Sequence, residues 1–119
     1  MSDGRERALQ ALRQLLLVDQ DVRRRLRANE TVIRRAIREL EKGSTIAATM
    51  EVTHVGFGRQ QVNEGLDALT LARHELLLAI TIAGLDEGMK AADLGRAWGV
   101  SRQLASRFVK EARSEAEQQ

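Results

Sequence analysis

Residues 90–112 constrain the fold of this chain most, because their helical pattern is interrupted at one defined place. Apolar residues recur at helical spacing before the sequence Gly99-Val100-Ser101 and again after it. Gly99 suits the positive φ at the end of a helix, which other residues adopt only with strain. Ser101 is a strong N-cap for the segment that follows. The stretch therefore predicts two helices joined by a tight turn.

We expect a compact core where these two helices cross. Gly95 is small at the predicted point of closest approach, and Val100 would fill the angle between the helices. Apolar residues at helical spacing complete the inner faces. The predicted turn and core residues are Leu94, Gly95, Trp98, Gly99, Val100, Leu104 and Phe108, with Ala91, Ala105 and Ala112 beside them.

The outer face of the second helix, expected over about residues 101–113, is polar and basic. Arg and Gln side chains can make paired hydrogen bonds to base edges in the major groove of DNA. Ser and Lys side chains suit contacts to phosphates. The candidate DNA-contacting residues are Ser101, Arg102, Gln103, Ser106, Arg107 and Lys110.

This layout resembles the helix-turn-helix of bacterial transcription regulators and of sigma-factor DNA-binding domains. In those families a small residue, a turn glycine, Val-Ser-Arg and a later Ser-Arg pair recur. Here they appear as Gly95, Gly99, Val100-Ser101-Arg102 and Ser106-Arg107. The resemblance covers about a fifth of the chain and implies that the second helix enters the major groove. The alternative for the same residues is an ordinary helical hairpin with a solvated basic face.

Composition narrows the classes of fold and function. The 119 residues include no Cys and no Pro, which excludes disulfides and thiolate metal sites and favours long uninterrupted helices. Leu, Ile, Val and Ala fill the expected core of a chain rich in Arg and Glu, as is typical of all-α proteins. The abundance of Arg and Ala also fits a bacterial origin.

Neither a membrane protein nor an enzyme is expected. No apolar run approaches the roughly 18 residues of a membrane span, and the first residues lack the apolar region of a signal peptide. A cytoplasmic, nucleoid-associated location is therefore expected. His54 and His74 have no metal-ligand or catalytic partners nearby in sequence, so we expect no metal, no cofactor and no catalysis.

The sequence of residues 1–58 predicts an N-terminal helical region. We expect this region to support the motif and to form dimers. Within it, Gly56 and Gly58 flank Phe57, which we expect to anchor a flexible turn to the core. The expected elements are a helix over residues 5–28, a second helix from the cap Asn29 to about Lys42, and a short helix with a loop over residues 45–58.

Residues 59–119 predict the DNA-binding region. The longest helix is expected over residues 59–84, and its last part would be the first helix of a three-helix core. Its heptad-like positions are Val62, Leu66, Leu69, Arg73, Leu76, Ile80 and Ala83. The polar tail after Ala112 is expected to fray and leaves no room for a β-hairpin wing. The predicted fold class is all-α, with N-terminal long helices followed by a C-terminal three-helix helix-turn-helix core without a wing.

Positive charge gathers at the two ends of the chain. Residues 1–43 have a surplus of four positive charges, residues 44–89 a deficit of four, and residues 90–119 a surplus of two. Such a distribution suits one part that meets phosphate and another that meets protein. The basic cluster Arg23, Arg24, Arg25 and Arg27 fits either a phosphate contact or a solvated helix face.

These patterns favour a transcriptional regulator that binds double-stranded DNA as a homodimer. One such module buries only about 600–1,000 Å² on DNA, which is small for specific binding. The N-terminal helices also carry more apolar surface than a monomer of this length can hide. Two alternatives stay open, a nucleoid-associated DNA binder of low specificity and a helical adaptor that contacts a protein of the transcription machinery.

Overall fold

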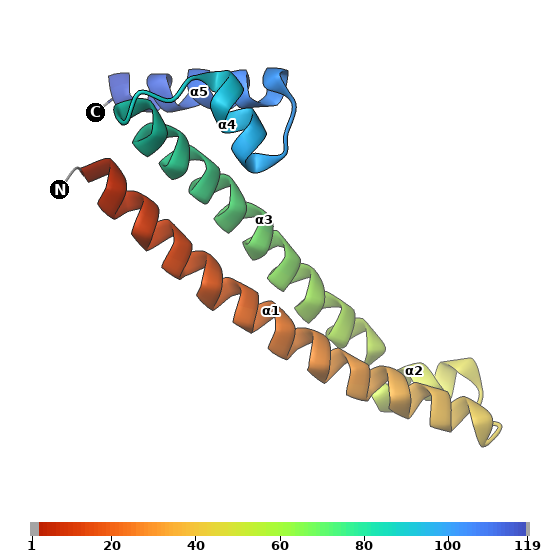
Figure 1. The fold of residues 1–119 in the computed structure, drawn as a ribbon. Coiled ribbons are helices and arrows are strands. Elements are labelled where there is room, and N and C mark those ends of the chain that lie inside the picture. Colours follow the sequence, from red (N-terminus) through yellow and green to blue (C-terminus); the bar gives the residue numbers. More distant parts are fainter. Residues whose placement is uncertain (1–2, 119) are drawn as a thin grey trace. The chain divides into compact units, whose positions relative to one another are not determined.

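The computed structural model describes residues 3–118, apart from the side chain of Ala116, as five α-helices (Figure 1). The described part of the chain contains no strand, so the predicted all-α class is confirmed. The helices are α1 (Asp3–Glu41), α2 (Ile46–Thr53), α3 (Val55–Asp86), α4 (Ala91–Trp98) and α5 (Arg102–Glu117).

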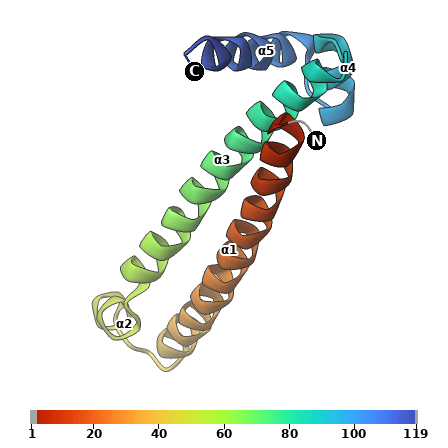
Figure 2. The same ribbon diagram turned by 90° about the vertical axis from the view of Figure 1, so that its left-hand side faces the viewer.

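The chain divides into two compact units. One consists of Met1–Leu15 and Leu71–Gln119, and the other of Leu16–Thr70. Within each unit a segment of α3 runs antiparallel beside a segment of α1 (Figure 1 and Figure 2). This division differs from the boundary at residue 58 expected from the sequence, because α1 and α3 each contribute to both units.

α1 is a single helix of 39 residues, so the predicted break and new helix at Asn29 are wrong. Asn29 lies inside the helix and is half-buried against α3. A Cβ atom placed on Gly58 of α3 would lie only 2.7 Å from the Asn29 side-chain oxygen. Helix propensity is a weak preference, and continuous packing against another helix outweighs the poor propensity of one Asn. α1 is therefore longer than α3, which the sequence had predicted to be the longest helix.

α3 has a small residue at every seventh position. These four residues are all buried and form the packing line of the helix: Gly58, Gly65, Ala72 and Ala79. A Cβ atom on Gly65 would lie 2.9 Å from the Arg25 side chain, so glycine permits a close approach of α1 and α3 in this unit. Seven-residue spacing keeps these positions on one side of the helix.

The heptad predicted for α3 is correct only in part. Leu76 is buried, whereas Leu66 is 44 % exposed. The spacing of the large apolar residues therefore misplaced part of the buried side of α3, which includes the small residues Gly58, Gly65, Ala72 and Ala79.

The connection between α1 and α3 differs from its prediction in one respect. The predicted short helix is present as α2, and the Thr45 hydroxyl caps it by accepting a hydrogen bond from the Ala48 N–H at 3.1 Å. The predicted loop is absent from residues 54–58, since His54 alone, with a φ of 54°, redirects the chain into α3. Gly56 and Gly58 therefore lie in a helix. Phe57 is 63 % exposed and does not anchor this segment to a core.

Two arginines of the predicted basic cluster, Arg24 and Arg25, make hydrogen bonds and ion pairs within the protein. Arg25 donates hydrogen bonds to the backbone and side-chain oxygens of Gln61, both at 2.9 Å, and to Asp21 at 2.7 Å. Asp21 also pairs with Arg24. The hydrogen bond from Arg25 is the main reason that the pKa of Asp21 lies below its usual value. For Arg24 and Arg25, the structure favours a helix face with internal ion pairs over a free phosphate site.

α3 is long and apolar enough, by length and composition alone, to cross a membrane, with a mean hydropathy of 1.4 over its most apolar 18 residues. The expectation that no segment meets this criterion was therefore too strong. A core helix of a water-soluble protein meets it as well, and 39 % of this stretch is buried inside the structure. Arg73 and Glu75 are exposed on α3. Because an Arg at the centre of a bilayer costs about 2.5–3.5 kcal/mol, these charges favour a helix in contact with water.

Candidate nucleic-acid interface

The turn between α4 and α5 is built by Gly99, Val100 and Ser101. Gly99 has a φ of 68° and ends α4. The Val100 N–H then donates a hydrogen bond to the Gly95 carbonyl at 2.9 Å. The Ser101 hydroxyl accepts a hydrogen bond from the Leu104 N–H at 3.1 Å and so caps α5. The turn leaves α4 and α5 packed against each other.

The core of this helix pair is small and tightly packed. A Cβ atom on Gly95 would lie 3.2 Å from the Val100 carbonyl oxygen and 3.4 Å from the Ala105 Cβ, so only a very small residue fits there. The buried residues are Leu94, Gly95, Ala105, Val109 and Ala112, and the half-buried residues are Ala91, Trp98, Val100, Leu104 and Phe108. Val109 was missed from the sequence, although its spacing of four from Ala105 and three from Ala112 is the signal that indicates it.

The basic face of α5 consists of five of the six predicted contact residues. Arg102, Gln103, Arg107 and Lys110 are exposed, and Ser106 is half-buried. These five residues line one shallow depression, whose lining contains three cations and no carboxylate. Ser101 is also exposed, but its hydroxyl oxygen already accepts the capping hydrogen bond. The sequence therefore placed the basic face correctly from the 3.6-residue period alone.

A neighbouring depression extends the positive surface towards the start of α4. Lys90, at the N-cap of α4, lines it together with Ser106, Lys110 and Arg113. Lys90 was missed as a candidate because all the predicted contact residues lie in the second helix of the motif. The signal that would have found it is a Lys just before a helix N-terminus, where backbone N–H groups also favour anions.

Two acidic residues of α5, away from its basic face, pair with residues of other helices. Glu111 pairs with His74 of α3 at 2.9 Å, and the His74 ring lies 5.8 Å from the Phe108 ring. Glu115 pairs with Arg7 of α1 at 2.6 Å. α5 continues to Glu117, so the predicted fraying after Ala112 is wrong over residues 113–117, while Gln119 lies outside the described residues. The two carboxylates face other helices, which leaves the basic face free of them.

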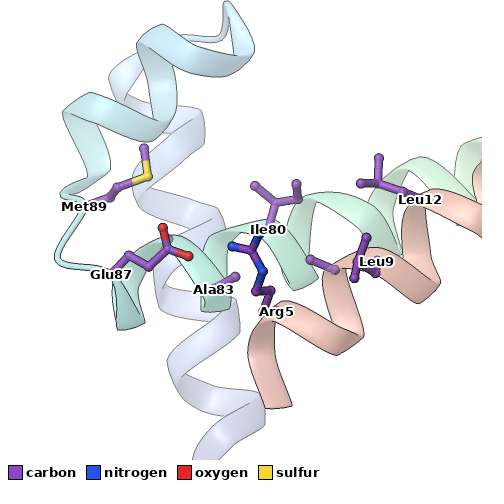
Figure 3. Close-up of a pocket in the computed structure, with 9 residues that line it drawn as sticks. Arg5, Leu9, Leu12, Ile80, Ala83, Glu87 and Met89 are labelled. Carbon is purple, nitrogen blue, oxygen red and sulfur yellow. The ribbon is translucent and has the colours of Figure 1, made fainter. Parts of the chain in front are cut away.

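A mainly apolar cavity of about 290 Å³ lies beside the loop that precedes α4 (Figure 3). It is lined from α1 by Leu9 and Leu12 and from α3 by Ile80 and Ala83, with Met89 from the loop. The described residues contain no group of three or more His, Cys, Asp or Glu placed to hold a metal ion. Comparison with protein-family models, with curated proteins and with solved structures finds no match to this chain.

Replacing Gly99 by alanine is expected to destabilise the protein by about 1–2 kcal/mol, because an L-residue with positive φ is strained. Gly56→Ala is the matched control, since Gly56 lies in α3 and a Cβ atom there meets nothing within 4 Å. We expect this control to be stabilising by about 0.5–1 kcal/mol through helix propensity. Urea denaturation of both variants measures the difference. Equal effects of the two substitutions would contradict both the turn at Gly99 and the helix at Gly56.

Proposed function

We propose that this protein binds double-stranded DNA as a transcriptional regulator, with α5 in the major groove. The observation that carries the proposal is the basic face of α5, on which Arg, Gln, Ser and Lys side chains gather without a carboxylate. Groups of this kind contact both base edges and phosphates. The bacterial, cytoplasmic setting inferred from composition belongs to the same proposal.

The order of residues along α5 supports a division of roles. In helix-turn-helix proteins the N-terminal part of the recognition helix reaches the base edges. Arg102 and Gln103 occupy that part here, and Arg107 and Lys110 follow one and two turns later. We assign base recognition to Arg102 and Gln103, and backbone contacts to Ser106 and Lys110, with Arg107 between the two groups.

The end of α3 supports a three-helix DNA-binding core. Its His74 contacts both Phe108 and Glu111 of α5, so α3 fixes the orientation of α5 from the side away from the basic face. A recognition helix needs such support, because base contacts depend on a fixed register along the groove. The core proposed is the last part of α3 with α4 and α5.

A low-specificity DNA binder and a protein adaptor are the two competing functions. The first would use Arg23 and Arg27, which are exposed on α1, in addition to α5. The second would use the acidic middle of the chain. The pairing of Arg24 and Arg25 with Asp21 removes much of the free charge that the first alternative needs. Binding to random DNA without sequence preference would favour it nonetheless.

The test compares Arg102→Ala with Lys110→Ala on a duplex pool of randomised sequence, with sequencing of the bound fraction. Arg102→Ala is expected to cost about 1–3 kcal/mol and to relax the preference at one base position. Lys110→Ala is expected to weaken binding to all sequences alike and to reduce the salt slope by about one. Trp98, the single Trp of the chain, provides a fluorescence signal close to the interface.

Arg34→Ala is the control, because Arg34 is an exposed cation on α1 and outside the motif. It should leave affinity and sequence preference nearly unchanged. Equal losses on every sequence for Arg102→Ala and Lys110→Ala would refute the division of roles. No binding by the unchanged protein at low salt would refute the proposed function and favour the adaptor.

A further inference from the structure

α1 carries a second apolar stripe, about 100° around the helix from the side that faces α3, and this stripe is exposed to solvent. Each position of this stripe is one residue C-terminal to a position that faces α3. Successive positions of the stripe are alternately three and four residues apart. In the unit Leu16–Thr70 this exposed stripe consists of Leu16, Asp19, Arg23, Leu26, Glu30, Ile33, Ile37 and Leu40. Its five apolar residues are 42 % to 58 % exposed. A helix that is apolar on two sides is usually buried on two sides.

The unit Leu16–Thr70 has almost no apolar core of its own. Its buried residues are Val22, Thr49, Thr53, Gly58 and Gly65, of which only Val22 is an aliphatic residue larger than alanine. Helices of soluble domains normally bury their apolar stripes in a shared core. A second layer of helix against the exposed stripe would supply the core that this unit lacks.

We propose that the exposed stripe of α1 pairs, antiparallel, with the same stripe of a second copy of this chain. The charges within the stripe select this arrangement. A parallel pair in register would place Asp19, Arg23 and Glu30 each against its own copy, and like charges in contact are destabilising. An antiparallel pair centred near Leu26 places Arg23 beside Glu30 of the second copy, and this contact occurs twice by symmetry.

The same arrangement places apolar residues opposite one another at two levels of the stripe, and it places Asp19 opposite Ile33. Residues whose numbers add to about 52 or 53 lie at the same level, so Leu16 of one copy meets Ile37 of the other, and Leu26 meets its own copy. Three charges among eight positions make the stripe unsuitable for a lipid bilayer, where charged side chains are costly. The pairing does not depend on DNA binding, which involves α5.

The first experiment measures the mass of the full chain by light scattering after size-exclusion chromatography. We expect about twice the chain mass of 13.3 kDa. Arg23→Glu and Glu30→Arg should each raise the dimer dissociation constant at least tenfold, because each introduces two like-charge contacts, and the double variant should restore it. Arg35→Glu, at an exposed position on the side of α1 opposite the stripe, is the control and should leave the dimer intact.

Cysteine cross-linking tests the direction of pairing independently of charge. The chain has no Cys, so each introduced thiol reports on one position. Leu16→Cys and Ile37→Cys should each fail to cross-link with itself, but the two variants mixed together should form a covalent dimer on oxidation. Self-cross-linking of either variant would overturn the antiparallel arrangement. A monomer at high micromolar concentration, or a dimer without the mixed cross-link, would overturn the proposal whether or not the protein binds DNA.

Discussion

Replacement of Leu94 by alanine is expected to lower the free energy of unfolding by about 2–5 kcal/mol. Leu94 is only 2 % exposed and is the largest buried side chain between α4 and the rest of its unit. Its Cδ2 methyl group lies close to Gly84 of α3, since a Cβ atom placed on Gly84 would be 3.0 Å from it. The alanine variant leaves a cavity that these helices cannot easily close.

Leu71→Ala is the matched control for this prediction, because Leu71 is 63 % exposed in the same unit. The same chemical change at this position should alter stability by about 0.5 kcal/mol or less. Denaturation followed by Trp98 fluorescence measures both variants, since Trp98 lies one turn from Leu94 on α4. Similar losses in the two variants would show that Leu94 does not hold α4 in place.

Ala79→Leu is expected to destabilise the protein by about 1–3 kcal/mol or more, because it overpacks a filled core. Ala79 is 0 % exposed and belongs to the line of small residues on α3. A leucine there must displace neighbouring groups, since Ala79 has no solvent-exposed side into which the added atoms could extend. Thermal unfolding followed by circular dichroism measures the loss.

The control for Ala79→Leu is Ala68→Leu, at an exposed position of the same helix. Leucine and alanine are both good helix formers, so this substitution should be nearly neutral. If Ala79→Leu were equally neutral, the small residues of α3 would not set the approach of its neighbours. The presence of glycine at the buried positions 58 and 65, in the other unit, would then need another explanation.

The candidate site was predictable to the extent that it depends on local sequence. The turn at Gly99, the cap at Ser101 and the basic face of α5 follow from residue conformation and a 3.6-residue period, which act within a few residues. The contacts that orient α5 were not predictable in this way. Arg7 and Glu115 are 108 positions apart in the sequence, and no local pattern indicates that their side chains pair.

The long helices show the same limit. Local preference predicted a helix start at Asn29 and a loop around Gly56 and Gly58, and both predictions were wrong. Asn29 and Gly58 both have a poor helix propensity, but they meet each other in the contact between α1 and α3. Propensity differences of less than about 1 kcal/mol per residue are smaller than the stabilisation that a continuous helix contact provides.

The sequence by itself determined the all-α class, the turn between α4 and α5, and the residues that share the basic face, because these features depend on near neighbours in the chain. Only the tertiary structure decided that α1 is continuous, that glycine and alanine form the packing line of α3, and that α1 has one covered and one exposed apolar stripe. Those features depend on which distant residues meet, and burial against them outweighs local preference.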